Sequence, residues 1–145
     1  MRTVSEIVGI QILLTSNAEQ TLFILVGADG SINRLGTGTL HNSDKELFVG
    51  KADISLFHAI RAGLSDEMLQ FTGGYSLPDQ RGIPCVLTVA LRFQDQTSDG
   101  FEFRYGTESN GPPGELAEFV RAAVRLTDPW FEEFKRMARA GKKTV

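Results

Sequence analysis

The side chains best suited to chemistry lie in two irregular segments rich in glycine, proline and polar residues. These segments are 72–84 (TGGYSLPDQRGIP) and 106–114 (GTESNGPPG). Both exceed the usual loop length of about four to six residues, and long loops carry function more often than short ones. The residues that could bind a polar ligand there are Tyr75, Asp79, Arg81, Thr107, Glu108 and Asn110. The alternative is that both segments are surface loops without a ligand.

The same two loops could also hold an enzyme site. A carboxylate of Asp79 or Glu108 could act as acid or base, and Arg81 could hold an anionic group of a substrate. The protein would then be a small hydrolase or transferase. Carboxylates on loops are common and mostly solvated, and no Gly-x-Ser-x-Gly nucleophile motif occurs in the chain. Catalysis is therefore the alternative to a non-catalytic role.

Metal and thiol chemistry have little support in the sequence. His41 and His58 are the only histidines, and neither has a partner at a spacing typical of metal ligands. His58 falls in an expected helix, where a partly buried structural histidine is the simpler interpretation. Cys85, the only cysteine, excludes an intrachain disulfide and is expected to be buried as a small hydrophobe. We expect no metal and no cofactor.

A cluster of glycines around Arg34 invites comparison with a phosphate-binding loop. The glycines are Gly27, Gly30, Gly36 and Gly38. Phosphate loops aim backbone N–H groups at the ligand from the N-terminus of a helix, but strand-like residues follow here. Neither GxGxxG nor a GK[ST] ending is present. These glycines are expected to form a hairpin turn and a strand bend or bulge.

The elements that position these residues begin with a hairpin over 20–38. Thr21 to Val26 is a dense apolar and β-branched run, Asp29-Gly30 suits a type I′ turn, and Ser31 to Leu35 runs back along the first strand. Both faces of the 21–26 strand are apolar. Such a strand belongs inside a sheet that is covered on both sides, by helices or by a second subunit.

Four further segments have the alternation or the turn signals of strands. They are 6–14, 46–50, 85–93 and 101–105. The short connections before residue 50 predict an antiparallel meander of about four strands. In the later hairpin, antiparallel pairing places Pro84 beside Gly106, so the two long loops emerge at the same end of the sheet. The outer face of this hairpin is polar and is expected to contact water.

Helical segments fill the rest of the chain. Two short helices are expected in the middle: one capped by Asp53 or Ser55 and ending at Gly63, and one starting at Ser65. At the C-terminus, 115–126 has apolar residues at the spacing of a core-facing helix. A separate last helix is expected to begin with Pro129 at its first position and to end at Gly141.

Length and composition place the chain among ordinary globular domains. It has 145 residues, 41% hydrophobic and 23% charged, with a net charge of −3. General nucleic-acid binders carry a basic surplus, so we expect no nucleic acid as partner. No run approaches the roughly 20 apolar residues of a membrane helix, so we expect no membrane. A lone cysteine fits a reducing compartment, so the expected location is the cytoplasm.

Together these patterns predict one α+β domain over residues 1–145, with 142–145 as a frayed tail. The expected fold is an antiparallel sheet of about six strands in two groups, with two C-terminal helices on one face and the short helices over an end or edge. The expected function is a non-catalytic module that binds an unknown protein or small polar ligand. A homodimer is a second expectation, because the 21–26 strand is apolar on both faces and the last helix is aromatic.

Overall fold

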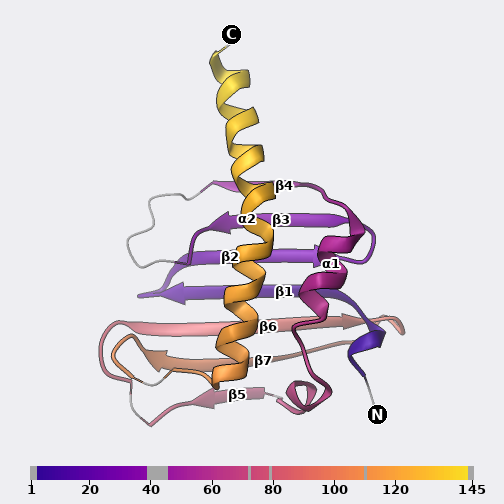
Figure 1. The fold of residues 1–145 in the computed structure, drawn as a ribbon. Helices are drawn as coiled ribbons and strands as arrows, with labels where there is room; N and C mark the ends of the chain where they lie inside the picture. Colours follow the sequence, from indigo (N-terminus) through magenta and orange to yellow (C-terminus); the bar gives the residue numbers. More distant parts are fainter. Residues whose placement is uncertain (1–2, 39–45, 72, 79, 110, 144–145) are drawn as a thin grey trace.

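The described part of the chain has an α+β fold with one mixed sheet and two α-helices (Figure 1). The computed structural model describes residues 3–38, 46–71, 73–78, 80–109 and 111–143, without the side chains of 139 and 141–143. The strands are β1 (Ile7–Ser16), β2 (Glu19–Gly27), β3 (Ser31–Gly36), β4 (Leu47–Lys51), β5 (Gly73–Ser76), β6 (Pro84–Phe93) and β7 (Ser98–Gly106). The helices are α1 (Ile54–Arg61) and α2 (Gly114–Lys143), with 3₁₀ turns η1 (Val4–Glu6) and η2 (Asp66–Gln70).

The described strands form a single sheet in the order β4-β3-β2-β1-β6-β7-β5. The predicted meander β1 to β4 is confirmed, and so is the β6–β7 hairpin, in which Pro84 stands opposite Gly106. The two predicted groups are in fact continuous, because β1 pairs with β6 over nearly its whole length. This pairing places β1 inside the sheet, between the apolar strands β2 and β6.

The prediction of about six antiparallel strands was wrong in one respect, the edge strand β5. It lies in segment 72–84, which we expected to be irregular, and it pairs parallel to β7, with Tyr75 opposite Phe103. The amide of Leu77 continues this ladder by donating to the carbonyl of Arg104. Segment 73–76 becomes a strand because its backbone pairs with the outer edge of β7. The glycine-rich composition of the segment does not reveal this pairing, which joins residues distant in sequence.

The two tight hairpins also differ from expectation. The type I′ geometry is found between β1 and β2, where Asn17 and Ala18 both have positive φ (53° and 65°). The turn between β2 and β3 is instead closed by the Gly30 amide, which donates to the Gly27 carbonyl, and only Gly30 has positive φ (92°). This is the longer hairpin, a turn followed by one left-handed glycine, so Asp29 needs no strained backbone.

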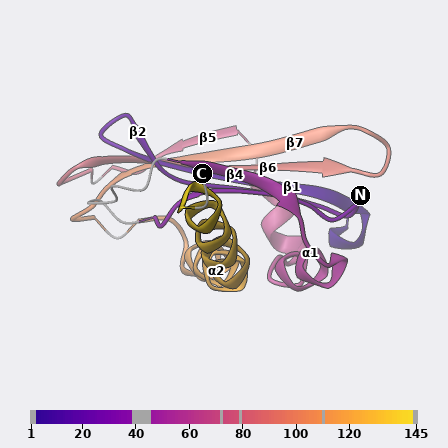
Figure 2. The same cartoon turned by 90° about the horizontal axis from the view of Figure 1, so that it is seen from above.

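The helices of the described chain lie on one face of the sheet (Figure 2). The apolar side chains of that face form the core together with the inner sides of α1, η2 and α2; Ile10, Ile12, Ile24, Val89, Phe57, Leu116 and Phe119 are among its most buried members. Of the two caps predicted for α1, the structure has Asp53, whose carboxylate accepts from the Ser55 amide. However, α1 lies on the same face as α2 rather than at an end or edge. The second short helix, with Ser65 as its cap, is the 3₁₀ turn η2.

The predicted pair of C-terminal helices is one continuous helix. α2 runs through Pro129 and past Gly141 to Lys143, crosses the strands, and extends beyond the edge strand β4 (Figure 1). A proline inside a helix removes a hydrogen bond and costs about 3 kcal/mol. The helix continues because it is anchored on both sides of Pro129. Phe119 before the proline and Phe131 after it are both buried against the same sheet. The apolar contact outweighs the local stop signal.

Candidate functional site

The two loops predicted to bind a ligand meet at one end of the sheet, as the β6–β7 register requires. The Glu108 amide donates to the Arg81 carbonyl at 2.9 Å, and the Ile83 amide donates to the Thr107 hydroxyl at 3.0 Å. A Cβ placed on Gly106 would lie only 2.0 Å from the Arg81 carbonyl oxygen. The backbones of the two loops therefore fill the space between them.

The structure brings only some of the predicted ligand-binding residues together. Arg81, Thr107 and Glu108 are neighbours, with exposed side chains. Tyr75 is on β5, and its ring stacks on Phe103 with centroids 4.8 Å apart, so it belongs to the aromatic part of the core. Asp79 and Asn110 lie outside the described residues. Ligand binding by these loops stays a prediction.

Of the residues weighed for metal and thiol chemistry, the structure describes His58 and Cys85. His58 is exposed on α1 rather than partly buried, and its Nδ1 lies 3.1 Å from the Arg61 guanidinium. His41 lies outside the described residues. Cys85 is buried, as predicted, and its sulfur lies 3.6 Å from the Ser16 hydroxyl. Within the described ranges no group of three acidic, histidine or cysteine side chains could hold a metal ion.

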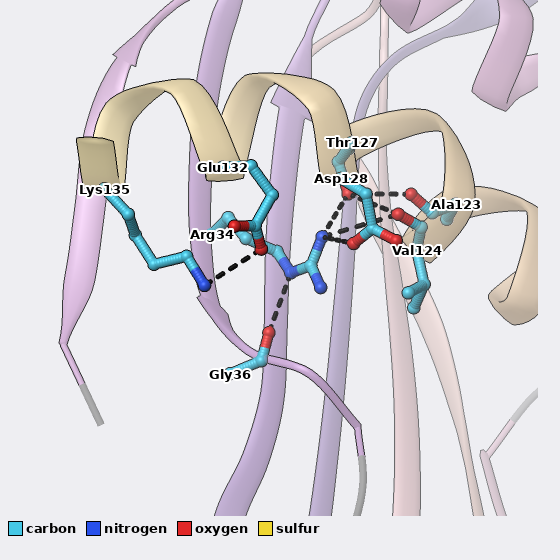
Figure 3. Close-up of polar contacts among 8 residues, drawn as sticks. All are labelled: Arg34, Gly36, Ala123, Val124, Thr127, Asp128, Glu132 and Lys135. Carbon is cyan, nitrogen blue, oxygen red and sulfur yellow. Dashed lines mark hydrogen bonds and ion pairs between the residues drawn. The ribbon is translucent and has the colours of Figure 1, made fainter. Parts of the chain in front are cut away.

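Arg34, weighed as a counter-charge for phosphate, anchors α2 to β3 (Figure 3). Its side chain is fully buried, and its guanidinium donates to the Gly36 carbonyl (2.9 Å), the Thr127 hydroxyl (2.8 Å) and the Asp128 carboxylate (3.0 Å). The guanidinium also lies over the Phe131 ring, 4.5 Å from its centroid. Bonds to charged groups in low dielectric are strong, so this arginine has a structural role. Arg34 and Ile32 are two residues apart on β3 and so point to the same face of the sheet. This spacing could have predicted that the Arg34 side chain is buried.

No helix in the described part of the chain covers the opposite face of the sheet (Figure 2). This open face is apolar over four strands. Leu13, Phe23, Leu35 and Leu47 stand opposite one another across β1, β2, β3 and β4. Leu25 and Val49 point to the same side by strand alternation. We call these six residues the apolar strip. Leu47 and Val49 are 47% and 61% exposed, and the other four are half-buried by their neighbours.

Charged side chains of the open face lie mainly in the other half of the sheet, apart from Lys51 at the end of β4. Glu102 and Arg104 on β7 form an ion pair at 3.3 Å, and Arg92 lies at the end of β6. The predicted contact of this hairpin with water is confirmed. The sequence indicated an apolar outer face on β2, but the extension of that face through β1, β3 and β4 required the register of the strands. Within the described residues, helices cover one face of β2, and cover of its other face stays a prediction.

Comparisons with protein-family models, with curated proteins and with solved structures find no match for this chain. In the part of the chain that the structure describes, α1 and α2 both lack the apolar length needed to cross a membrane. Function must therefore be inferred from the surfaces and cavities of the molecule.

Proposed function

We propose that this protein is a non-catalytic interaction module that pairs with a second copy of itself through the open face of its sheet. The observation that carries the proposal is the apolar strip, a continuous row of large aliphatic and aromatic side chains that no part of the described chain covers. Contiguous apolar patches on protein surfaces mark interaction sites, and stacked sheets bury such faces against each other about 10 Å apart.

A second copy is favoured by the distribution of charge. In a symmetric dimer, each patch meets the same patch of its partner. A two-fold axis through Phe23 would place five strands (β4, β3, β2, β1 and β6) against the same five of the partner. Most outward side chains of these strands are uncharged, whereas Glu102 and Arg104 would stay outside the overlap in water. This arrangement buries apolar surface without burying the ion pair, which would be costly.

The size of the overlap is sufficient for a specific contact. Five strands spaced about 4.8 Å apart, with about seven residues each at about 3.3 Å per residue, give a footprint of roughly 550 Å² per copy. The total of roughly 1,100 Å² exceeds the ~1,000 Å² expected of a biological interface, at its lower end. The dimer should therefore depend on protein concentration.

An enzyme site between loops 72–84 and 106–114 has weaker support. The loop backbones touch, and the Glu108 carboxylate is exposed rather than enclosed in a pocket. Carboxylates that act as an acid or base in enzymes usually lie in a cleft. A cytoplasmic location, suggested by the single cysteine, stays a prediction.

Sedimentation velocity over a range of protein concentrations tests the dimer. The unmodified chain should shift from monomer to dimer with concentration, and Leu35→Lys should remain monomeric because it places two like charges near the two-fold axis. Ser76→Lys adds the same charge on β5, outside the overlap, and should dimerise like the unmodified chain. If Leu35→Lys impairs folding by circular dichroism, the milder Leu35→Gln should still weaken the dimer. A chain that stays monomeric throughout, or a Leu35→Lys variant that dimerises normally, would overturn the proposal.

A further inference from the structure

A cavity of about 460 Å³ lies between the first half of α2 and the ends of four strands of the sheet. It is on the helical face, away from the apolar strip. Its apolar lining comes from Leu14, Leu22, Leu87, Val120 and Val124. Small-molecule sites typically have volumes of about 300–1,000 Å³ and are mostly apolar, with a few polar groups that orient the ligand. The cavity has the size and lining of such a site.

The polar groups around this cavity are mainly basic. Arg121 and Arg125 lie one helical turn apart on α2, and both line the cavity. Arg121 is exposed and donates to the Glu118 carboxylate at 2.6 Å, whereas Arg125 has no ion pair within the described ranges. Asp128, the one carboxylate among the described lining residues, is paired with the buried Arg34 at 3.0 Å. The rim therefore presents positive charge that is only partly neutralised.

Tyr105 also lines the cavity. Burial, with a smaller contribution from the Cys85 thiol opposite it, raises the pKa of Tyr105 to about 12. Its hydroxyl is therefore neutral and able to donate a hydrogen bond throughout the physiological range. A neutral donor and two arginines beside an apolar cavity match a ligand with an apolar body and one anionic group.

We infer that this cavity binds an amphipathic carboxylate, with its aliphatic or aromatic body among the leucine and valine side chains and its carboxylate at Arg121 and Arg125. Guanidinium groups suit carboxylates because their N–H donors match both oxygens. The ligand enters beside α2 and does not require the open face of the sheet. This inference is therefore independent of the proposed dimer.

Isothermal titration calorimetry with decanoate, compared with the uncharged decanol, tests the charge requirement. Decanoate should bind with one site per chain and more tightly than decanol, and added salt should weaken only the decanoate complex because salt screens exposed charges. Arg125→Gln should weaken decanoate binding by about two- to fivefold and leave decanol unchanged, as expected for an exposed charge pair. Equal affinity for the two ligands, or no saturable binding of decanoate, would overturn the inference.

Two variants locate the site. Ala117 also lines the cavity, so Ala117→Phe should fill it and abolish binding of both ligands, and Ala117→Leu should weaken binding to a lesser degree if the larger substitution impairs folding. Arg136→Gln is the matched control for the arginine variants. It breaks an ion pair with Glu133 on the same helix, at the end that extends past β4, and should leave decanoate affinity unchanged. Binding that survives both Ala117 variants, or that falls with Arg136→Gln, would place the ligand elsewhere.

Discussion

Replacing Gly106 by alanine should force apart the two loops at the end of the sheet. A Cβ at this position would lie 2.0 Å from the Arg81 carbonyl oxygen and 2.5 Å from the carbonyl carbon of Gln80. Non-bonded heavy atoms pack favourably only at about 3.5 Å or more, so the 80–81 backbone has to retreat by roughly 1.5 Å. Backbone cannot rotate aside as a long side chain can, so the strain is not easily relieved.

The expected cost follows from the contacts that this movement disturbs. The Glu108 amide would lose its bond to the Arg81 carbonyl, and the adjacent bond from the Thr107 amide to the Ile83 carbonyl would weaken. Each is worth about 1 kcal/mol net, and overpacking adds about 1–3 kcal/mol. We expect the free energy of unfolding to fall by about 2–4 kcal/mol.

Urea denaturation followed by the fluorescence of Trp130, the only tryptophan, measures this change. Gly74→Ala on β5 is the matched control, because the nearest atom to its added Cβ is 3.8 Å away. That variant should stay within about 0.5 kcal/mol of the unmodified chain. Hydrogen exchange at the Glu108 amide should also accelerate in Gly106→Ala alone. Equal stability of the two alanine variants would refute the argument that these loop backbones are in direct contact.

Three further predictions concern the backbone, a buried phenol and the helix contact. Ala18→Gly should raise the unfolding free energy by about 0.5–1 kcal/mol in the same urea assay, because Ala18 has φ 65° and glycine adopts that conformation without steric cost; an unchanged or lower stability would count against the turn geometry. The free energy of unfolding should fall as the pH rises from about 10, the pKa of Tyr105 in the unfolded chain, through about 12, its pKa in the folded chain, because the unfolded chain releases the proton first. Thermal melts should show this loss of stability, and Tyr105→Phe should reduce it. Gly50→Ala should shift the Trp130 emission spectrum, because the added Cβ would lie 3.0 Å from that ring, and an unchanged spectrum would mean that α2 does not rest on β4 as described.

Several parts of the fold could be predicted because their signals are local. Strand period and turn residues identify the β1–β4 meander, and the antiparallel rule alone puts Pro84 opposite Gly106. The cap at Asp53 needs only one side chain and the amide two residues later. In each case the residues that decide the structure are close in sequence or related by a fixed repeat.

Other parts escaped prediction because distant contacts overrode local preference. Pro129 is a strong start signal, yet α2 continues through it because buried residues on both sides pack on one sheet. Glycines in segment 72–84 suggested an irregular loop, yet β7 recruits part of it as β5. The cavity beside α2 combines residues from strands β1, β2, β6 and β7 with one helix, and no single stretch of sequence contains its pattern.

From the sequence alone came the alternation of apolar and polar residues, and with it the α+β class, the strands of the meander and the expectation that the 21–26 strand needs cover on two sides. The spacing of apolar residues is enough to predict these features, because the face on which a side chain lies depends only on its position along its own helix or strand. The tertiary structure decided which strands are neighbours, that both helices share one face, and that the uncovered face carries a continuous apolar strip. Those features depend on contacts between residues that are distant in sequence. Which of these residues meet is decided only when the register of every strand is set.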